Sequence, residues 1–279
     1  MNPVFGFARS LYRKFGGPGL GLQPLFQRYF QPSRVELDGF HLHLDPADRM
    51  ISFRLAIDGE WAHVETEVFR KLVKPGAVVL DVGAHIGYFS LLASTLTGPS
   101  GRVYAFEPEP RNRALLEKNV ASNSRANVVV VPKAVSDSAG TARLQLHAQN
   151  TGAHSLFSAP GTAAGSVEIE TVALGAWMKE NNVEPSLIKL DLEGGEWRAL
   201  EGMSDFVARK RPLALVLEYI PAAITRSGRD PWEWLDRLAK FGFRFSRIDE
   251  DRGVQTPMTA DQISFAFSQS HCDLLCERD

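Results

Sequence analysis

The feature that most constrains the fold is a repeated alternation of short apolar runs with amphipathic segments, which begins at residue 77. The apolar runs are AVVLDVG (77–83), RVYAFEP (102–108), NVVVVP (127–132), SLIKLDLEG (186–194) and LALVLEYI (213–220). The first three are separated by segments with helical spacing, GYFSLLASTL (87–96) and PRNRALLEKNV (110–120). Strands that are apolar on both faces and alternate with helices predict the α/β class, with a doubly wound, mostly parallel sheet and helices on both faces.

Two parts of the chain depart from this rhythm. VELDGFHLHLD (35–45) and MISFRLAI (50–57) predict a small antiparallel meander, which a helix over residues 64–73 should follow. TARLQLH (141–147) and SVEIETV (166–172) alternate with period two. This alternation predicts an antiparallel insertion at about residues 141–174, near the carboxyl edge of the sheet, where doubly wound proteins bind ligands.

The C-terminal part should complete the sheet. Asp230, Pro231 and Glu233 have the pattern of a helix start, so a helix should run to about Phe241. Two last strands are expected near 243–248 and 272–276. The chain then divides into an arm (1–34), a small strand and helix extension (35–73) and a main domain (74–279) that contains the insertion.

Length and composition exclude several classes of protein. The chain has 279 residues, 44% of them hydrophobic and 23% charged, with a net charge of −2, which is typical of a globule with a sizeable core. Cys272 and Cys276, four apart on one strand, would lie about 13 Å from each other, beyond disulfide reach. No apolar run approaches the roughly 18 residues that span a bilayer, and no signal peptide is evident. These features favour a cytoplasmic protein.

The arm differs in charge from the remainder of the chain. Up to Val35 it has five basic side chains and no acidic one. Val4, Ala8, Leu11 and Phe15 recur at helical spacing before the glycine-rich GGPGLG (16–21), which predicts an amphipathic helix and a hinge. The helix would pack on the body or on a second subunit, or contact a membrane surface or an acidic partner. The pattern leaves these alternatives and the oligomeric state open.

The turn after the first predicted strand has the character of a nucleotide site. Asp81 ends the strand, and Gly83 and Gly87 follow immediately before a helix, where bare backbone and unpaired N–H groups can approach a ligand. An acid at the strand tip would repel a pyrophosphate and attract an ammonium group, which favours S-adenosylmethionine over NAD. Glu107 ends the second strand, where a carboxylate can accept hydrogen bonds from ribose hydroxyls.

With these motifs the sequence resembles the FkbM-type S-adenosylmethionine-dependent methyltransferases. The resemblance runs from about Gly39 to the C-terminus and rests on VKPGAVVLDVGAHIGYFSLLAS, AFEPEPRNRALLEKNV, VPKAVSDSAG and IKLDLEGGEWRALEG. The last segment is the most specific, because IKxDxEGxE is characteristic of that group. The resemblance implies a class I methyltransferase (Rossmann-like) fold and O-methylation of a hydroxyl on a sugar, glycan or polyketide-type small molecule.

The resemblance also implies which residues contact S-adenosylmethionine. Asp81, Gly83 and Gly87 would lie at its methionine end and Glu107 at its ribose, with Ala134 to Asp137 near the adenine. His85, which replaces a commoner asparagine, would touch the cofactor carboxylate or cap the helix.

Several positions depart from the family pattern. Leu174, Gly175 and Ala62 stand where many members have acids, so substrate contacts are not carried over from those positions. Gly195 stands where an aromatic side chain is common, which favours a roomier acceptor pocket.

Methyl transfer to a hydroxyl needs alignment of donor and acceptor and removal of a proton. The resemblance places Asp191 and Glu193 facing the methyl group, and residues two apart on a strand share a face. The alternative is that these acids cap the following helix. His154, on the insertion, is a second candidate base, with a surface position as its alternative. The tryptophans are expected in the core: Trp61, Trp177, Trp197, Trp232 and Trp234.

Other functions remain open at this point. Asp191 and Glu218, at neighbouring strand tips, could hold a divalent cation that lowers the pKa of the acceptor, but a third ligand is not evident and no metal site is assigned. A non-catalytic binding or scaffold module on the same fold would bind the cofactor without turnover. A nucleic acid substrate is disfavoured, because the fourth strand ends in DLEGGE and not in the N/D-P-P-aromatic sequence of that class.

Overall fold

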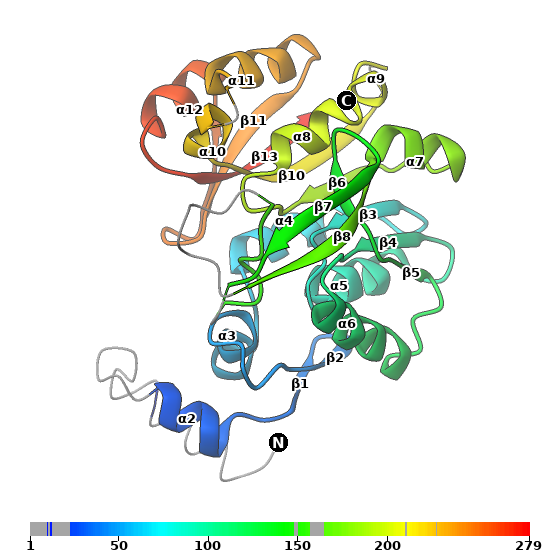
Figure 1. Cartoon of the computed structure of the whole chain (residues 1–279), viewed down its shortest axis with the longest axis vertical. Helices are drawn as coiled ribbons and strands as arrows, with labels where there is room; N and C mark the ends of the chain where they lie inside the picture. The colour runs from blue at the N-terminus through cyan, green and yellow to red at the C-terminus, as the bar shows by residue number, and fades with distance from the viewer. Residues whose placement is uncertain are drawn as a thin grey trace.

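The computed structural model describes residues 10, 12, 23–147, 150–156, 165–209, 211–226 and 228–279 (Figure 1). The glycine hinge and most of the predicted amphipathic helix of the arm lie outside the described residues; of that helix, Ser10 and Tyr12 are described and helical, and Tyr12 is buried against Phe26 and Phe53. Helix α2 (Gln23–Phe30) is the first element described, and in Figure 1 it lies at the edge of the molecule. Within the described ranges, no helix is both long and apolar enough to cross a membrane.

The centre of the molecule is an eight-stranded sheet with the order β12-β11-β13-β10-β9-β3-β4-β5. The strands are β3 (Val78–Val82), β4 (Arg102–Phe106), β5 (Val128–Val131), β9 (Leu187–Leu190), β10 (Leu213–Tyr219), β11 (Arg244–Asp249), β12 (Val254–Met258) and β13 (Cys272–Arg278). The ladders from β5 through β4, β3 and β9 to β10 are parallel, and β13 runs antiparallel between β10 and β11. This confirms the mostly parallel sheet and the two predicted last strands.

Helices cover both faces of this sheet. One face carries α3 (Ile51–Asp58), α4 (His63–Leu72), α5 (Tyr88–Thr97) and α6 (Pro110–Ser122). The other carries α7 (Leu174–Glu180), α8 (Glu196–Glu201), α9 (Ser204–Val207), α10 (Pro221–Arg226), α11 (Pro231–Lys240) and α12 (Ala260–Ala266). Neighbouring strand residues alternate between the two cores: Val79 packs with Phe69 and Leu91, whereas Leu80 packs with Trp197 and Leu235. The doubly wound arrangement is therefore confirmed.

The prediction of strand for residues 50–57 was wrong, because MISFRLAI forms helix α3. A short apolar run does not by itself distinguish a buried strand from a buried helix. Asp48 stabilises the start of the helix, because its carboxylate accepts hydrogen bonds from Met50 N at 3.1 Å and from Ser52 N at 2.6 Å. At the other end, Gly59 adopts a left-handed conformation with φ 75°, which terminates the helix.

Other helix predictions are confirmed. Helix α4 covers the predicted residues 64–73 to within one residue. Helix α11 begins after Asp230, whose side chain accepts the backbone N–H of Trp232 at 2.8 Å. Strand β12 and helix α12 were not anticipated. Both cysteines lie on β13, where they are buried as free thiols.

The insertion forms a separate three-stranded sheet with the order β6-β8-β7. Its strands are β6 (Ala134–Ser136), β7 (Gly140–Gln145) and β8 (Ser166–Ala173). Strands β7 and β8 pair antiparallel, as the period-two alternation predicted. In Figure 1 this sheet stands in front of the carboxyl edge of the central sheet, above α5 and α6.

The hairpin of β1 (Arg34–Leu37) and β2 (Phe40–His43) is bound to α6 by two asparagine side chains. Asn119 accepts His43 N at 2.7 Å and donates to His43 O at 3.2 Å and Ile86 O at 2.8 Å. Asn123 makes the same exchange with His41, at 2.9 and 2.7 Å. The two asparagines lie about one helical turn apart, so they reach two alternate residues on the edge of β2, His43 and His41. Their side-chain amides pair with backbone groups of β2 that would otherwise need a neighbouring strand.

We expect Asn119→Ala to lower the free energy of unfolding by about 2–4 kcal/mol, since it leaves buried backbone groups of His43 and Ile86 unpaired. Asn119 is fully buried, whereas Asn123 is partly exposed, so water can replace its bonds. Asn123→Ala is the matched control and should cost about 1 kcal/mol. Urea denaturation of both variants measures the difference, and equal losses would contradict the role of Asn119.

Candidate active site

In the turn between β3 and α5, the backbone of Gly83 packs directly against the backbone of Asp191, at the end of β9. Gly83 has φ 86°, and a Cβ built on it would lie 2.0 Å from the carbonyl oxygen of Asp191. The N–H groups of Gly83 and Ala84 both donate to Phe106 O, at 3.0 and 2.9 Å. His85 also has a positive φ of 51°, and its N–H donates to Glu107 Oε2 at 2.8 Å. The turn is thus fixed by β4 and β9 and tolerates no side chain at Gly83.

Glu107 is buried beside this turn, with 5% of its surface exposed. One carboxylate oxygen accepts the N–H of His85 and the other accepts the N–H of Glu109 at 2.9 Å. Burial raises the pKa of Glu107 to about 8. Glu109 in turn caps α6 by accepting Asn112 N at 2.7 Å. The carboxylate predicted at the ribose is therefore held in one orientation by backbone groups.

A small cavity lies between this turn and the insertion. Its lining residues are Gly83, His85, Glu107, Pro108, Asn112, Ala134, Val135, Leu144, Thr151, Gly152, His154, Leu156, Asp191, Leu192 and Gly195. The segment 150–156 crosses it: His85 Nε2 lies 2.7 Å from Thr151 Oγ1, and Asn112 Nδ2 donates to Thr151 O at 3.0 Å. Of the residues predicted to bind cofactor or catalyse, this cavity brings together Gly83, His85, Glu107, Ala134, His154 and Asp191.

The remaining predicted cofactor residues, Asp81, Gly87 and Asp137, line neither this small cavity nor the larger cavity on the other side of Asp191. Asp81 is 1% exposed and accepts a hydrogen bond from Ser90 Oγ at 2.5 Å, and burial raises its pKa. Asp137 pairs with Arg198 at 3.1 Å. Gly87 has φ 94° at the start of α5. Direct cofactor contacts by these three residues stay predictions.

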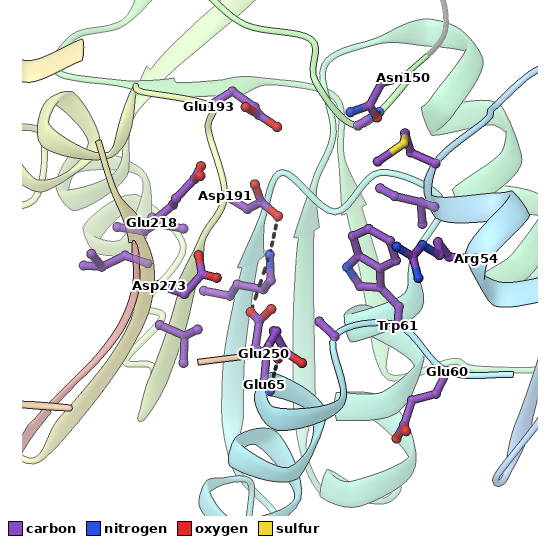
Figure 2. A pocket seen from close by; sticks show the side chains of 18 of the residues that line it. Arg54, Glu60, Trp61, Glu65, Asn150, Asp191, Glu193, Glu218, Glu250 and Asp273 are labelled. Atoms are coloured by element: carbon purple, nitrogen blue, oxygen red, sulfur yellow. Dashed lines mark hydrogen bonds and ion pairs between the residues drawn. The ribbon is translucent and has the colours of Figure 1, made fainter. Parts of the chain in front are cut away.

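A large cavity of about 490 Å³ opens on the other side of Asp191. It is lined by Met50, Ile51, Arg54, Asp58, Glu60, Trp61, Ala62, Glu65, Asn150, Gly152, Lys189, Leu190, Asp191, Glu193, Val216, Leu217, Glu218, Glu250, Asp251 and Asp273. Figure 2 shows Glu218 and Asp273 on one wall, Trp61 and Arg54 on the opposite wall, and Asp191 between them. Asp191 and Gly152 line both cavities, so the two meet there.

The large cavity is strongly acidic. Its acidic lining residues outnumber the basic ones nine to two. Burial, and next repulsion by the Asp191 carboxylate, raise the pKa of Glu193 to about 7, of Glu218 to about 9 and of Asp273 to about 6. Glu218 and Asp273 are direct register partners across β10 and β13, which places their carboxyl groups side by side. At neutral pH this wall therefore contains both protonated and ionised carboxyl groups.

Glu193 sits in a strained backbone conformation at the edge of the large cavity. Its φ is 51°, in the left-handed region, and its carbonyl oxygen accepts a hydrogen bond from Ser155 Oγ at 2.9 Å. Helix α8 begins after Gly195 without a side-chain cap, and it is the Glu196 carboxylate that holds the preceding turn, by accepting Leu192 N at 2.8 Å and Gly194 N at 3.1 Å. Strain of this kind costs about 1–3 kcal/mol and persists where the surroundings fix it, often at functional sites.

His154 lies in the small cavity, away from the acidic wall. Its Nδ1 accepts the backbone N–H of His147 at 3.0 Å, and burial lowers its pKa. A neutral imidazole that accepts at Nδ1 has its proton on Nε2, so neither nitrogen is then free to take a proton.

Sequence reasoning missed several residues of the large cavity. Trp61 was expected in the core but lines this cavity, and Glu65, Glu250 and Asp273 were not singled out. Asp273 did give a signal, since it is a charged residue within the apolar strand CDLLC. In the described part of the chain, no group of three or more His, Cys, Asp or Glu side chains is placed to hold a metal ion.

The fold and site together define a class of protein. The parallel strands, the reversed β13 between β10 and β11, the glycine turn after β3 and the acid at the tip of β4 are those of a class I methyltransferase. The family model for the methyltransferase FkbM domain matches residues 81–245. The chain belongs to the FkbM methyltransferase family.

Three curated relatives are similar over part of their lengths. The 31-O-demethyl-FK506 methyltransferase FkbM of Streptomyces tacrolimicus is 35% identical over 52% of this chain and 55% of its own. The hexuronic acid methyltransferase AglP of Haloferax volcanii is 28% identical over 50% of this chain and 57% of its own. The 2-O-methyltransferase NoeI of Sinorhizobium fredii is 26% identical over 53% of this chain and 66% of its own. The chain thus spans less than two thirds of each relative.

The backbone contact at Gly83 makes a stability prediction. We expect Gly83→Ala to cost about 1–2 kcal/mol for the left-handed backbone and a further 1–3 kcal/mol or so for the steric conflict with Asp191 O. Gly253, with φ 67° and open space around its missing Cβ, is the control, so Gly253→Ala should cost only the backbone term. Denaturant titration compares the two, and equal losses would show that the conflict is relieved by movement of β9.

Proposed function

We propose that the protein is an S-adenosylmethionine-dependent O-methyltransferase that acts on a hydroxyl of a sugar, glycan or polyketide-type small molecule. The observation that carries this proposal is the junction of two cavities at Asp191. A nucleoside-type cavity lies on one side of that carboxylate and a larger, acidic cavity on the other. A methyl donor and an acceptor bound in these cavities would meet at the junction.

The small cavity fits the cofactor chemically. His85 Nδ1 is buried and has no hydrogen-bond partner within the described part of the chain, so it is available to the amino or carboxylate group of the methionine moiety. Each oxygen of Glu107 accepts one backbone N–H and keeps a second lone pair for a ribose hydroxyl. When bound, S-adenosylmethionine supplies an electrophilic methyl group on a positively charged sulfur.

Entry of the cofactor requires the roof of the small cavity to move. The cavity volume is about 50 Å³, whereas sites for ligands of this size enclose about 300–1,000 Å³. The segment 150–156 is held across it by the contacts of Thr151 with His85 and Asn112. Breaking these two contacts would free Thr151, while Ser155 stays paired with Gln145 and Glu193 at the other end of the segment.

The geometry supports Glu193 as the base that takes the hydroxyl proton. Glu193 lines the large cavity, its carboxyl group has a pKa of about 7, and the strained backbone fixes its position. Asp191 is ion-paired with Lys189 at 2.7 Å, so one of its carboxylate oxygens is already engaged. His154 lies in the other cavity with its Nδ1 already used.

The lining of the large cavity supports a polyhydroxylated acceptor. Carboxylate oxygens accept hydrogen bonds from hydroxyl groups, and the protonated acids can donate to them. Trp61 offers an apolar ring face beside these polar groups. The names of the relatives specify a 31-O position of FK506, a hexuronic acid and a 2-O position, all consistent with hydroxyl acceptors.

The direct test is to incubate the full chain with methyl-labelled S-adenosylmethionine and a panel of acceptors. The panel contains methyl glycosides of neutral hexoses, a methyl hexuronide and a macrolide alcohol, and mass spectrometry detects labelled ethers. Cofactor binding without methylation of any panel member would favour the binding-module alternative. Loss of activity with a chelator and recovery with Mg²⁺ would favour the metal-assisted alternative.

Measured above pH 8, where the Glu107 carboxyl group is ionised, Glu107→Ala should weaken S-adenosylmethionine binding by about 1.5–3 kcal/mol, roughly 10–150-fold in Kd, because a charge-assisted hydrogen bond to the ribose is lost. Glu117→Ala is the control, since Glu117 is on the exposed side of α6, with 58% of its side chain accessible. Isothermal calorimetry measures both, and circular dichroism checks that each variant is folded. An unchanged affinity in Glu107→Ala would remove the ribose assignment.

Glu193→Gln should lower turnover by roughly 10²–10⁴ and change cofactor affinity little. In the wild type the rate should rise with pH through about 7, because the carboxyl group must lose its proton before it can act as a base. This ascending limb should vanish in the variant.

His154→Ala and Asp191→Asn are compared in the same assay. A loss confined to His154→Ala would reassign the base to the histidine. Full activity in all three variants, without chelator sensitivity, would leave positioning as the only source of catalysis.

A further inference from the structure

Lys189 belongs to the most specific motif of the sequence, IKLDLEGGE, and has no part in the mechanism above. It lies on β9, and only 4% of its side chain is exposed. Taking an ammonium group out of water is costly unless good partners surround it. A lysine in this position at the floor of the large cavity therefore needs an explanation.

The partners of Lys189 come from the end of its own strand and from α4, β3 and α5. Its Nζ lies 2.7 Å from Asp191 Oδ2 and 3.9 Å from Glu65 Oε1 on α4, the two contacts drawn as dashed lines in Figure 2. Asp81 on β3 is its register partner in the parallel ladder. The ring of Phe89 lies 4.9 Å from the ammonium. The ammonium thus contacts the carboxyl groups of Asp191 and Glu65 and an aromatic face, with Asp81 on the neighbouring strand.

These contacts keep the lysine charged. Burial alone would lower the pKa of Lys189, but Asp191, Glu65 and Asp81 together raise it. The benefit is mutual, since the ammonium is the counter-ion of Asp191 and opposes the rise that burial causes in the pKa of Glu65 and Asp81. Glu65 and Asp81 are fixed on a helix and within a strand, whereas Asp191 lies just beyond the end of β9 with 45% of its side chain exposed. Asp191 is therefore the partner that is free to move.

We propose that Lys189 is a positioning residue for methyl transfer, whose ammonium holds the carboxylate of Asp191 at the junction of the two cavities. One oxygen of Asp191 is bound to Lys189, so the side chain keeps one rotamer and presents its other oxygen to the junction. Lys189 acts through Asp191 on where an acceptor is placed. The kinetic part of this inference rests on the proposed function, and the structural part does not.

The structural part is tested by a crystal structure of the full-length Lys189→Met variant, which keeps the length of the side chain and removes its charge. We expect Asp191 to leave the junction or to occupy several rotamers. Lys133→Met is the matched control, because it removes an ammonium 3.1 Å from Glu170 on the inserted sheet, away from both cavities. An Asp191 side chain unmoved in Lys189→Met would overturn the proposal. No acceptor is needed, so a failed methylation assay leaves this test intact.

The kinetic part uses S-adenosylmethionine and the same glycoside panel. Lys189→Met should lower kcat roughly 10²-fold, as a misplacement of about 1 Å can do, while the Kd for S-adenosylmethionine changes less than about threefold. If Lys189 acts through Asp191, the double variant with Asp191→Asn should be no slower than Asp191→Asn alone. Fully additive losses would refute the coupling.

Lys189→Arg covers the case in which the methionine variant does not fold. It keeps the positive charge with a different hydrogen-bond geometry. Asp191 should stay at the junction, and turnover should recover to within about tenfold of the wild type. Wild-type turnover with Asp191 displaced would overturn the proposal.

Discussion

The close approach of two backbones at the end of β3 is the constraint on which the rest of the site depends. The β3–β9 ladder pairs Asp81 with Lys189 and Val82 with Leu190, and it continues with a hydrogen bond from Asp191 N to Val82 O at 3.0 Å. The next residue, Gly83, then turns away with its α-carbon against the Asp191 carbonyl. Because neither strand can shift without breaking the ladder, the small cavity and the acidic cavity are kept on opposite sides of one carboxylate.

The two cavities differ in where their walls come from. Every lining residue of the small cavity falls within the stretch that matches the family model, residues 81–245. The large cavity also uses Trp61 and Glu65 from before this stretch, and Glu250 and Asp273 from after it. The small cavity is therefore built within the stretch that the family model matches, whereas the large cavity also needs the segments before and after it.

The acidic residues of the large cavity differ in their electrostatic surroundings, although their side chains are chemically similar. Lys189 pairs with Asp191, so that this acid is held as an ion pair. Glu193 and Glu218 face the cavity with raised pKa values, and Glu218 has the imidazole of His271 at 3.8 Å. The same low-dielectric surroundings that make an isolated carboxylate costly make it a better base, because its affinity for a proton rises. Neighbouring acids on one strand tip can thus serve positioning and proton transfer.

The sequence by itself determined the sheet, its helices, the period-two insertion and the glycine turn with Glu107, because these follow from local periodicity and from residues close together in the chain. It did not determine whether MISFRLAI is strand or helix, since that depended on hydrogen bonds to the Asp48 carboxylate and on burial of Phe53 against Phe26 of α2. Nor did it predict that Trp61, Glu65 and Asp273 share one cavity. Only the tertiary structure decided this, because residues so far apart in the chain meet through strand order and register, and the pairing of Lys189 with Asp191 and Glu65 exists only once those elements have packed.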